Sequence, residues 1–304
     1  MVSPQGGLGN RLRAIAGAMV LAQQTGRTCY HAWRRIVPND SRSYVRELQI
    51  LGYDVFFEDS EHLSAATADS VPVIDVCFSE WLPGDGWYAV QSDAQRDWGV
   101  VPFAMRYNNP ADAVAQSRAE VVLIESSHAA RLSAANRGYD TDSMWDTAIS
   151  AAYAQLLPRR LYCRVSDSVP ECDICFHVRR GDILEYFPES RQSIEAISSW
   201  AIEVGAGYTV CVLSDDAATR TSLAEALAKA GISVVNCHAL GLGNFGTQER
   251  AFIEFLDMAR RCRLITGTPA SSFAFEASRF GQRPYFRNLD SPTKIRAALQ
   301  MVSF

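Results

Sequence analysis

Apolar residues recur along the second half of this chain at two alternating periods. Short β-branched runs predict buried strands at residues 173–178, 208–213, 233–237 and 264–266. Apolar residues at helical spacing predict helices at residues 193–204, 217–230, 247–261 and 272–280. Strands that alternate with helices form a parallel sheet with helices on both faces. The second half is therefore predicted to be α/β.

The first half shows a weaker pattern of the same kind. It predicts strands near residues 28–32, 54–57, 71–76 and 121–124, and helices at residues 12–24 and 144–156. A chain of 304 residues exceeds the usual size of a single hydrophobic core. We therefore expect two domains, residues 1–157 and 158–304, with the boundary in the turn Leu157–Arg160.

The composition is that of a globular protein and does not by itself indicate a function. Apolar residues make up 48% of the chain and charged residues 21%, as in an ordinary globular protein. The net charge of -5 argues against a nucleic-acid partner. No stretch of about 18 apolar residues occurs, so no transmembrane segment is predicted.

A candidate ligand-binding cluster lies at the end of the strand at 173–178. His177, Arg179 and Arg180 lie there together, followed by Gly181 and Asp182. Open α/β sheets bind ligands beyond the carboxyl ends of their strands, and the arginine fork matches phosphate oxygens. A phosphorylated ligand is the natural prediction. The alternative is a solvated Arg-Arg turn with a salt bridge to Asp182.

Three further segments have ligand-binding features after a strand. Gly6–Arg11 is a glycine loop that leads into a helix, which leaves backbone amides free for a negative or polar group. Asp215 and Asp216 follow the strand at 208–213, and either could simply cap the next helix. Ser271 and Ser272 precede the helix at 272–280, where hydroxyls and amides can hold phosphate oxygens or cap the helix.

These four segments resemble, in the same order, motifs of the fucosyltransferases that use GDP-fucose. That family includes the α1,2, α1,6 and nodulation enzymes and, more distantly, the protein O-fucosyltransferases. Its H-x-R-R or H-x-R-x-G-D motif matches residues 177–182, and its amino-terminal glycine loop matches residues 6–10. The resemblance implies that Arg179 contacts the donor diphosphate. It also places Asp215 or Asp216 near the nucleotide and the serine pair near the diphosphate.

The resemblance implies a GT-B type fold, with two Rossmann-like domains and a cleft between them. Residues 1–157 would then form the acceptor-side domain and residues 158–304 the domain that binds GDP-fucose. The predicted cleft loop consists of Gly7, Gly9, Asn10 and Arg11. The predicted donor site consists of His177, Arg179, Arg180, Asp215, Asp216, Glu254, Ser271, Ser272 and Phe273.

The predicted reaction is inverting transfer of fucose to a glycan hydroxyl without a metal or other cofactor. Arg179 would stabilise charge on the leaving diphosphate, and Asp182, Glu185 or Glu189 could accept the acceptor's proton. Only Phe273–Glu276 matches the family's aromatic-rich continuation after the serine pair, so another sugar nucleotide is the alternative donor. A non-catalytic protein that binds sugar nucleotides or glycans is the alternative class. We expect a cytoplasmic location if the chain is complete, and the Golgi lumen if an amino-terminal anchor has been removed.

Two short motifs are discounted. Residues 241–246 match G-x-G-x-x-G, but they follow the third strand of their domain, whereas a dinucleotide fingerprint follows the first. Asp140-Thr141-Asp142 matches the metal-binding D-x-D of another glycosyltransferase class, but Asp142 or Ser143 is expected to cap a helix. We therefore predict neither NAD nor metal binding at these places.

Cysteines and tryptophans leave alternatives open. The eight cysteines are interpreted mainly as free thiols, and Cys172-Asp173-Ile174-Cys175 as strand alternation, since no second pair follows at zinc spacing. In a secretory protein, Cys163 with Cys172 or Cys175 would be the first disulfide to suspect. Four tryptophans could form an acceptor platform or belong to the core: Trp33, Trp81, Trp87 and Trp98.

Overall fold

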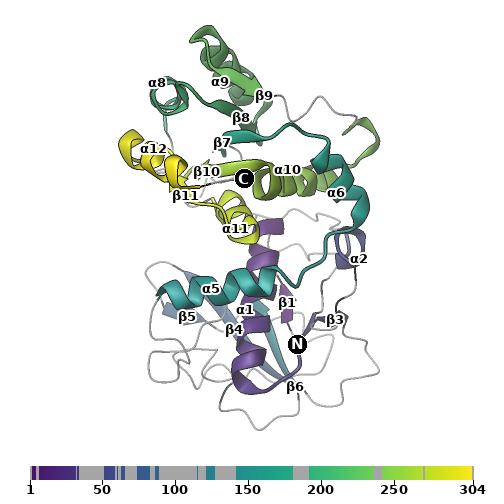
Figure 1. Cartoon of the computed structure of the whole chain (residues 1–304). Coiled ribbons are helices and arrows are strands. Elements are labelled where there is room, and N and C mark those ends of the chain that lie inside the picture. Colours follow the sequence, from purple (N-terminus) through teal and green to yellow (C-terminus); the bar gives the residue numbers. More distant parts are fainter. Residues whose placement is uncertain are drawn as a thin grey trace. The chain divides into compact units, whose positions relative to one another are not determined.

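A computed structural model divides the chain into two compact units, Met1–Leu157 and Pro158–Phe304 (Figure 1). The structure describes residues 2–4, 7–31, 33, 51–58, 60, 63–65, 74–82, 86–88, 115, 121–126, 142–180, 192–235, 242–269 and 271–302. Among these residues, no helix is both long and apolar enough to cross a bilayer.

Unit 1 contains a six-stranded sheet in the order β3-β2-β1-β6-β4-β5. Its pairs are parallel except for the antiparallel pair β4–β5. The strands are β1 (Val2–Pro4), β2 (Tyr30–His31), β3 (Ser64–Ala65), β4 (Ile74–Leu82), β5 (Gly86–Tyr88) and β6 (Val121–Ser126). The helices are α1 (Leu8–Thr25), α2 (Tyr53–Phe56) and α5 (Asp142–Tyr153).

The prediction of a strand at residues 54–57 is wrong, because the chain forms the helix α2 there. Tyr53, Phe56 and Phe57 are buried and follow the i, i+3, i+4 spacing of one helical face. Gly52 precedes the helix in an extended conformation, and Asp54 supplies an acidic residue to its first turn. The other three predicted strands of unit 1 overlap β2, β4 and β6.

Unit 2 contains a parallel five-stranded sheet in the order β11-β10-β7-β8-β9. The strands are β7 (Cys172–Val178), β8 (Thr209–Ser214), β9 (Ser233–Val235), β10 (Cys262–Gly267) and β11 (Tyr285–Arg287). The helices are α6 (Arg160–Asp167), α8 (Ile194–Gly205), α9 (Ala217–Lys229), α10 (Thr247–Arg261), α11 (Ser272–Gly281) and α12 (Pro292–Met301), with a 3-10 turn η5 (Leu242–Asn244). Every strand and helix predicted for this half is present.

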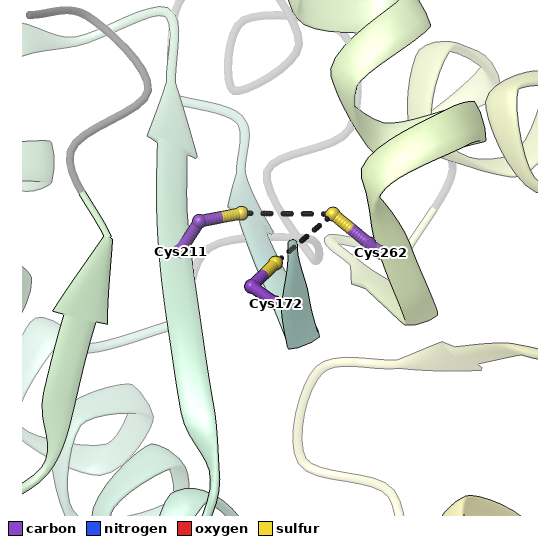
Figure 2. Close-up of side chains that lie close together, drawn as sticks. All are labelled: Cys172, Cys211 and Cys262. Atoms are coloured by element: carbon purple, nitrogen blue, oxygen red, sulfur yellow. Dashed lines mark hydrogen bonds between the residues drawn. The ribbon is translucent and has the colours of Figure 1, made fainter. Parts of the chain in front are cut away.

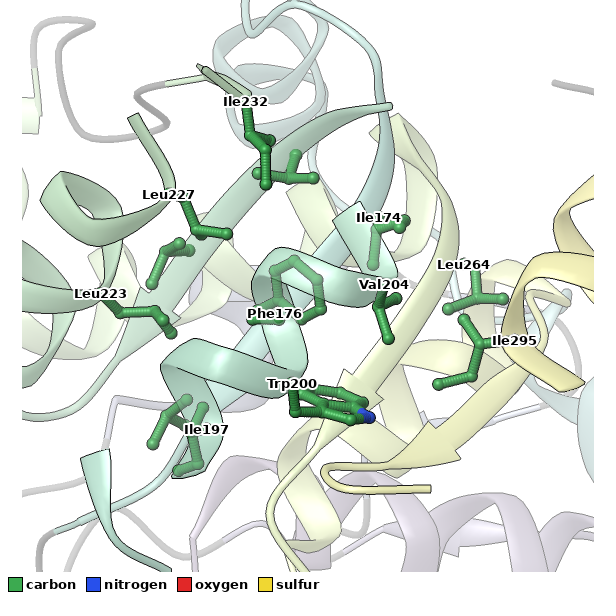
Figure 3. Close-up of a cluster of buried hydrophobic side chains, with 14 of the residues drawn as sticks. Ile174, Phe176, Ile197, Trp200, Val204, Leu223, Leu227, Ile232, Leu264 and Ile295 are labelled. Atoms are coloured by element: carbon green, nitrogen blue, oxygen red, sulfur yellow. The ribbon is translucent and has the colours of Figure 1, made fainter. Parts of the chain in front are cut away.

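The core of unit 2 lies between the sheet and the helices α8, α9 and α12 (Figure 3). Phe176 of β7 packs edge-to-face against Trp200 of α8, with ring centroids 5.5 Å apart. The indole of Trp200 also donates a hydrogen bond to the carbonyl of Asp290 at 2.7 Å. The helix α10 packs against α6 and α11 and, with them, covers the other face of the sheet. Helices on both faces leave the strand ends as the accessible parts of the sheet.

The discounted glycine motif ends at the start of a helix. Gly246 precedes α10, and its amide donates to the Glu249 carboxylate at 2.8 Å. Glu249 also accepts a hydrogen bond from the Tyr162 hydroxyl at 2.9 Å, which ties α6 to α10. Gly246 therefore belongs to the start of α10.

Candidate functional site

The candidate site lies at the carboxyl ends of three adjacent strands of unit 2. The strand β7 lies between β10 and β8, and all three run parallel. Arg179 follows β7, Asp215 follows β8 and Thr268 follows β10. Parallel strands end at the same edge of a sheet, so the fold brings these three sequence-distant segments together.

Side chains from both neighbouring strand ends fix the backbone of the arginine turn. The Arg179 amide donates to the Thr268 hydroxyl at 2.9 Å, and the Arg180 amide donates to Asp215 Oδ1 at 2.7 Å. The Arg179 guanidinium Nε lies 3.9 Å from Asp215 Oδ2. The Arg179 side chain is 28% exposed, so a ligand can reach part of it. The turn is therefore preorganised, with one guanidinium aimed by Asp215.

His177 is a buried anchor for the end of β7. Its carbonyl accepts hydrogen bonds from the Thr268 amide at 3.2 Å and from Asn288 Nδ2 at 3.0 Å. Its ring centroid lies 5.6 Å from that of Phe273. Burial lowers the pKa of His177 to about 4, so the ring is neutral at neutral pH. The positive charge of the site therefore comes from the arginines, and a donor-binding role for His177 stays a prediction.

The two aspartates after β8 have different roles. Asp216 is the N-cap of α9, because its Oδ2 accepts a hydrogen bond from the Thr219 amide at 2.7 Å. Hydrogen bonds from Thr219, first from its side chain and then from its amide, lower the pKa of Asp216. Asp215 instead contacts the arginine turn. The capping alternative thus applies to Asp216, and Asp215 is the better candidate for the site.

We expect Asp216→Ala to lower the stability of the protein by about as much as Ser193→Ala. Ser193 caps α8 through the same kind of hydrogen bond, from the Ala196 amide at 3.0 Å, and loss of such a serine cap typically costs ~1 kcal/mol. Urea denaturation of the two variants measures both effects. An unchanged midpoint for Asp216→Ala would show that its side chain does not cap the helix.

Ser271 is a buried polar side chain at the start of α11. It occupies the N-cap position but its side chain makes no capping hydrogen bond, and the residue is 3% exposed. Among the described residues, its hydroxyl has no hydrogen-bond partner. A simple capping role therefore does not explain this hydroxyl, and its contact with a diphosphate stays a prediction. Ser272 begins the helix and is half-buried.

A glycine is needed where β10 reaches this site. A Cβ on Gly267 would lie 2.7 Å from the Tyr285 hydroxyl and 2.9 Å from Cβ of Ala274. The start of α11 therefore approaches the strand more closely than any side chain at position 267 would permit.

Glu254 of α10 is a largely buried carboxyl group. Burial raises the pKa of Glu254 to about 7, against the opposing effect of Arg220. Protonated and ionised forms are therefore both populated near neutral pH. A protonated carboxyl can donate a hydrogen bond to an acceptor atom of a ligand. Its place in the donor site stays a prediction.

The predicted general bases are not among the described residues. Asp182, Glu185 and Glu189 lie within residues 181–191, outside the described ranges. Their assignment as acceptors of a proton stays a prediction from sequence. The D-x-D motif lies outside as well, except that the backbone of α5 begins at Asp142.

The glycine loop of unit 1 leads directly into α1. Gly7 precedes the helix, and its carbonyl accepts the Arg11 amide at 3.0 Å. Asn10 accepts a hydrogen bond from Arg13 at 2.9 Å through its side-chain oxygen. Gly9 is buried within the first turn of α1. The prediction that this loop faces an interdomain cleft concerns the placement of the units and stays a prediction.

Arg11 is 1% exposed, which the sequence did not indicate. Its guanidinium lies 5.1 Å above the Trp33 ring centroid, a cation–π contact. Burial lowers the pKa of Arg11 to about 10, so the group stays charged at neutral pH.

Trp33 belongs to the core of unit 1. Its side chain is buried near Tyr53 and Phe56, and its indole donates to the Leu51 carbonyl at 2.9 Å. The core interpretation therefore holds for Trp33. Trp81 and Trp87 are register partners in the β4–β5 hairpin, and Trp98 lies outside the described residues.

Sequence reasoning missed two residues of the site. Thr268 fixes the Arg179 amide, and Asn288 bonds to the His177 carbonyl from the end of β11. Thr268 could have been found, because it lies two residues after the strand predicted at 264–266. Asn288 could not, because β11 was not predicted.

Comparison with solved structures identifies the fold. The chain resembles POFUT1 in complex with GDP, with a TM-score of 0.60 and 13% identity over 95% of this chain and 97% of that one. It resembles a variant of Arabidopsis thaliana FUT1 in complex with GDP, with a TM-score of 0.55 and 12% identity over 94% and 69%. It also resembles NodZ alpha-1,6-fucosyltransferase soaked with GDP-fucose, with a TM-score of 0.51 and 18% identity over 92% and 91%.

This chain has their fold. The fold class predicted from the motif resemblance, α/β of the GT-B type, is therefore confirmed. At these identities the likeness concerns the fold alone. No protein-family model matches the sequence, and no curated protein matches it either.

Proposed function

We propose that this protein transfers fucose from GDP-fucose to a glycan hydroxyl, inverting the anomeric carbon and using no metal ion. The observation that supports this most is the arginine turn. Thr268 and Asp215 hold the amides of Arg179 and Arg180 at the carboxyl edge of a parallel sheet. The fold likeness to proteins bound to GDP or GDP-fucose supports the same donor.

The chemistry that such a turn favours is cleavage of the bond between the sugar and the diphosphate. Negative charge grows on the leaving diphosphate as the anomeric C–O bond breaks, and fixed donors that meet this charge lower the barrier. In this proposal Arg179 supplies the main contact, and Arg180, Ser271 and Ser272 assist. The acceptor hydroxyl attacks from the opposite face, and its proton passes to a carboxylate, with Asp182, Glu185 and Glu189 as the candidates.

The first test is calorimetric titration of the whole protein with GDP, GDP-fucose and UDP in buffer without added divalent metal. We expect the guanine nucleotides to bind and UDP to bind more weakly. Preference for UDP would keep the enzyme class and change the donor. Absence of nucleotide binding would contradict the proposal.

Turnover is tested separately, because binding alone does not separate an enzyme from a sugar-nucleotide-binding protein. Incubation with GDP-fucose should release GDP by slow hydrolysis, and faster when a suitable glycan acceptor is added. Tight GDP-fucose binding with no GDP release, with or without a panel of glycans, would favour the non-catalytic class.

A further inference from the structure

Three cysteines from different strands meet in the interior of unit 2 (Figure 2). Cys172 opens β7, Cys262 opens β10 and Cys211 lies in β8. Each is at most 2% exposed. Cys172 Sγ lies 3.2 Å from Cys262 Sγ, and Cys262 Sγ lies 3.8 Å from Cys211 Sγ. All three sulfur atoms lie within 4.8 Å of one another.

These spacings match a tetrahedral thiolate site. Zinc binds cysteine sulfur at ~2.3 Å, and tetrahedral geometry then places two bound sulfurs about 3.8 Å apart. The Cys262–Cys211 separation of 3.8 Å matches that value, and the Cys172–Cys262 separation of 3.2 Å is somewhat shorter. Small movements of side chains that already converge would therefore place three sulfurs around one ion.

Two further groups lie beside the three thiols. Cys175 of β7 is fully buried and is the register partner of Cys211 in β8. Asp257 of α10 is 1% exposed, and among the described residues neither of its carboxylate oxygens has a hydrogen bond of ordinary geometry, although Ser166 lies nearby. Its backbone carbonyl accepts the Cys262 thiol at 3.5 Å. A buried carboxylate is costly without compensation, and an adjacent cation would provide it.

We propose that Cys172, Cys211 and Cys262 bind one zinc ion as thiolates, with Cys175 or Asp257 able to complete the tetrahedron. Binding displaces the thiol protons into solvent, so no oxidant or reductant is needed. The C-x-x-C of β7 would then be half of a site whose other half comes from strands far away in sequence. Strand alternation alone does not account for Cys172, whether or not a metal binds, because its thiol contacts that of Cys262.

The site is structural in this proposal. Cys172 and Cys262 begin their strands, whereas Arg179 follows the opposite end of β7. Seven steps of extended chain separate Cys172 from Arg179, or about 23 Å at a rise of ~3.3 Å per residue. Because Cys262 directly follows α10, an ion here would tie the end of that helix to three strands. The proposal does not depend on the identity of the donor.

Metal analysis of the native protein is the first test. The full chain is purified from zinc-supplemented cells without a histidine tag, and its zinc content is measured by mass spectrometry. We expect close to one zinc per chain. Replacement by Co²⁺ should give a sulfur-to-cobalt charge-transfer band and the intense visible bands of tetrahedral cobalt. Removing the zinc with a chelator should lower the Tm by about 5 °C or more.

Variants then locate the ion. Cys262→Ser and Cys211→Ser should each weaken zinc affinity by at least about 100-fold, since even second-shell changes cost 10–100-fold. Cys163→Ser is the matched control, because the Cys163 thiol contacts the Pro158 carbonyl instead. Cys175→Ser and Asp257→Asn, compared by their cobalt spectra, identify the fourth ligand. If a variant does not fold, the cobalt spectrum of the native protein still decides.

Thiol counting in denaturant, without reductant, separates the competing outcomes. Metal-free protein that takes up no Co²⁺ and shows all eight thiols would overturn the proposal in favour of packed free cysteines. Metal-free protein with two thiols fewer would overturn it in favour of a disulfide. Zinc retained equally by the control and by both cluster variants would place the ion elsewhere and also contradict the proposal.

Discussion

Arg179→Ala is expected to reduce the rate of fucose transfer by a factor of a few hundred, as when one preorganised donor worth about 3 kcal/mol is lost from a transition state. GDP affinity should fall as well, because the ground-state diphosphate already carries charge. The physical basis is the fixed turn, in which Thr268 and Asp215 hold the amides of both arginines. Steady-state kinetics with GDP-fucose and calorimetry with GDP measure the two effects.

Two substitutions make this result specific. Arg179→Lys keeps the charge but loses the planar fork, so it should recover GDP affinity only in part. Arg164→Ala removes an exposed arginine of α6 in the same unit and should leave binding and rate unchanged. An Arg179→Ala protein that binds GDP as tightly as the native protein would place the diphosphate elsewhere.

The sequence predicted unit 2 well because its signals are local. Each of its predicted strands is a short β-branched run that is followed by helical spacing, and the capping residues Ser193 and Asp216 mark two of the helix starts. Once the sheet is parallel, the carboxyl ends of its strands share one edge, which places Arg179 and Asp215 at the same edge.

The missed elements lack such local signals. Only two residues of α6, Tyr162 and Ser166, are buried, and Leu161 on the same helix is 55% exposed. The helix is held by a long-range contact, the Tyr162–Glu249 hydrogen bond. The strand β11 has three residues and follows Pro284, so periodicity has too few positions to act on. Tertiary contacts, which a local pattern does not contain, decide these segments.

The same limit applies to the sites. The arginine motif was visible because its residues are adjacent in sequence. Cys211 and Cys262 lie 51 residues apart, so a search for paired cysteines at zinc spacing did not find them. Asn288 likewise reaches His177 across 111 residues of chain. Only the strand order β11-β10-β7-β8 brings these side chains together.

Gly281→Ala is expected to destabilise the protein by about 3 kcal/mol, although alanine is ordinarily the better helix former by ~1 kcal/mol. A Cβ on Gly281 would overlap the Ala259 carbonyl oxygen and lie 2.7 Å from Ala259 Cα. These neighbours are backbone atoms of α10, so they cannot turn away as a side chain could, and α11 would have to move as a whole. Urea denaturation measures the loss.

Gly243→Ala is the matched control, because a Cβ there would have no neighbour within 4 Å, and we expect a change within about 0.5 kcal/mol. Equal stability of Gly281→Ala and the native protein would mean that α10 and α11 pack less closely than described. The outcome bears on function, because α11 begins at Ser271 and Ser272 and contributes Phe273 beside His177. If Gly281→Ala folds with α11 shifted, it should therefore bind GDP more weakly than the native protein. Gly243→Ala provides the baseline against which the loss of stability is judged.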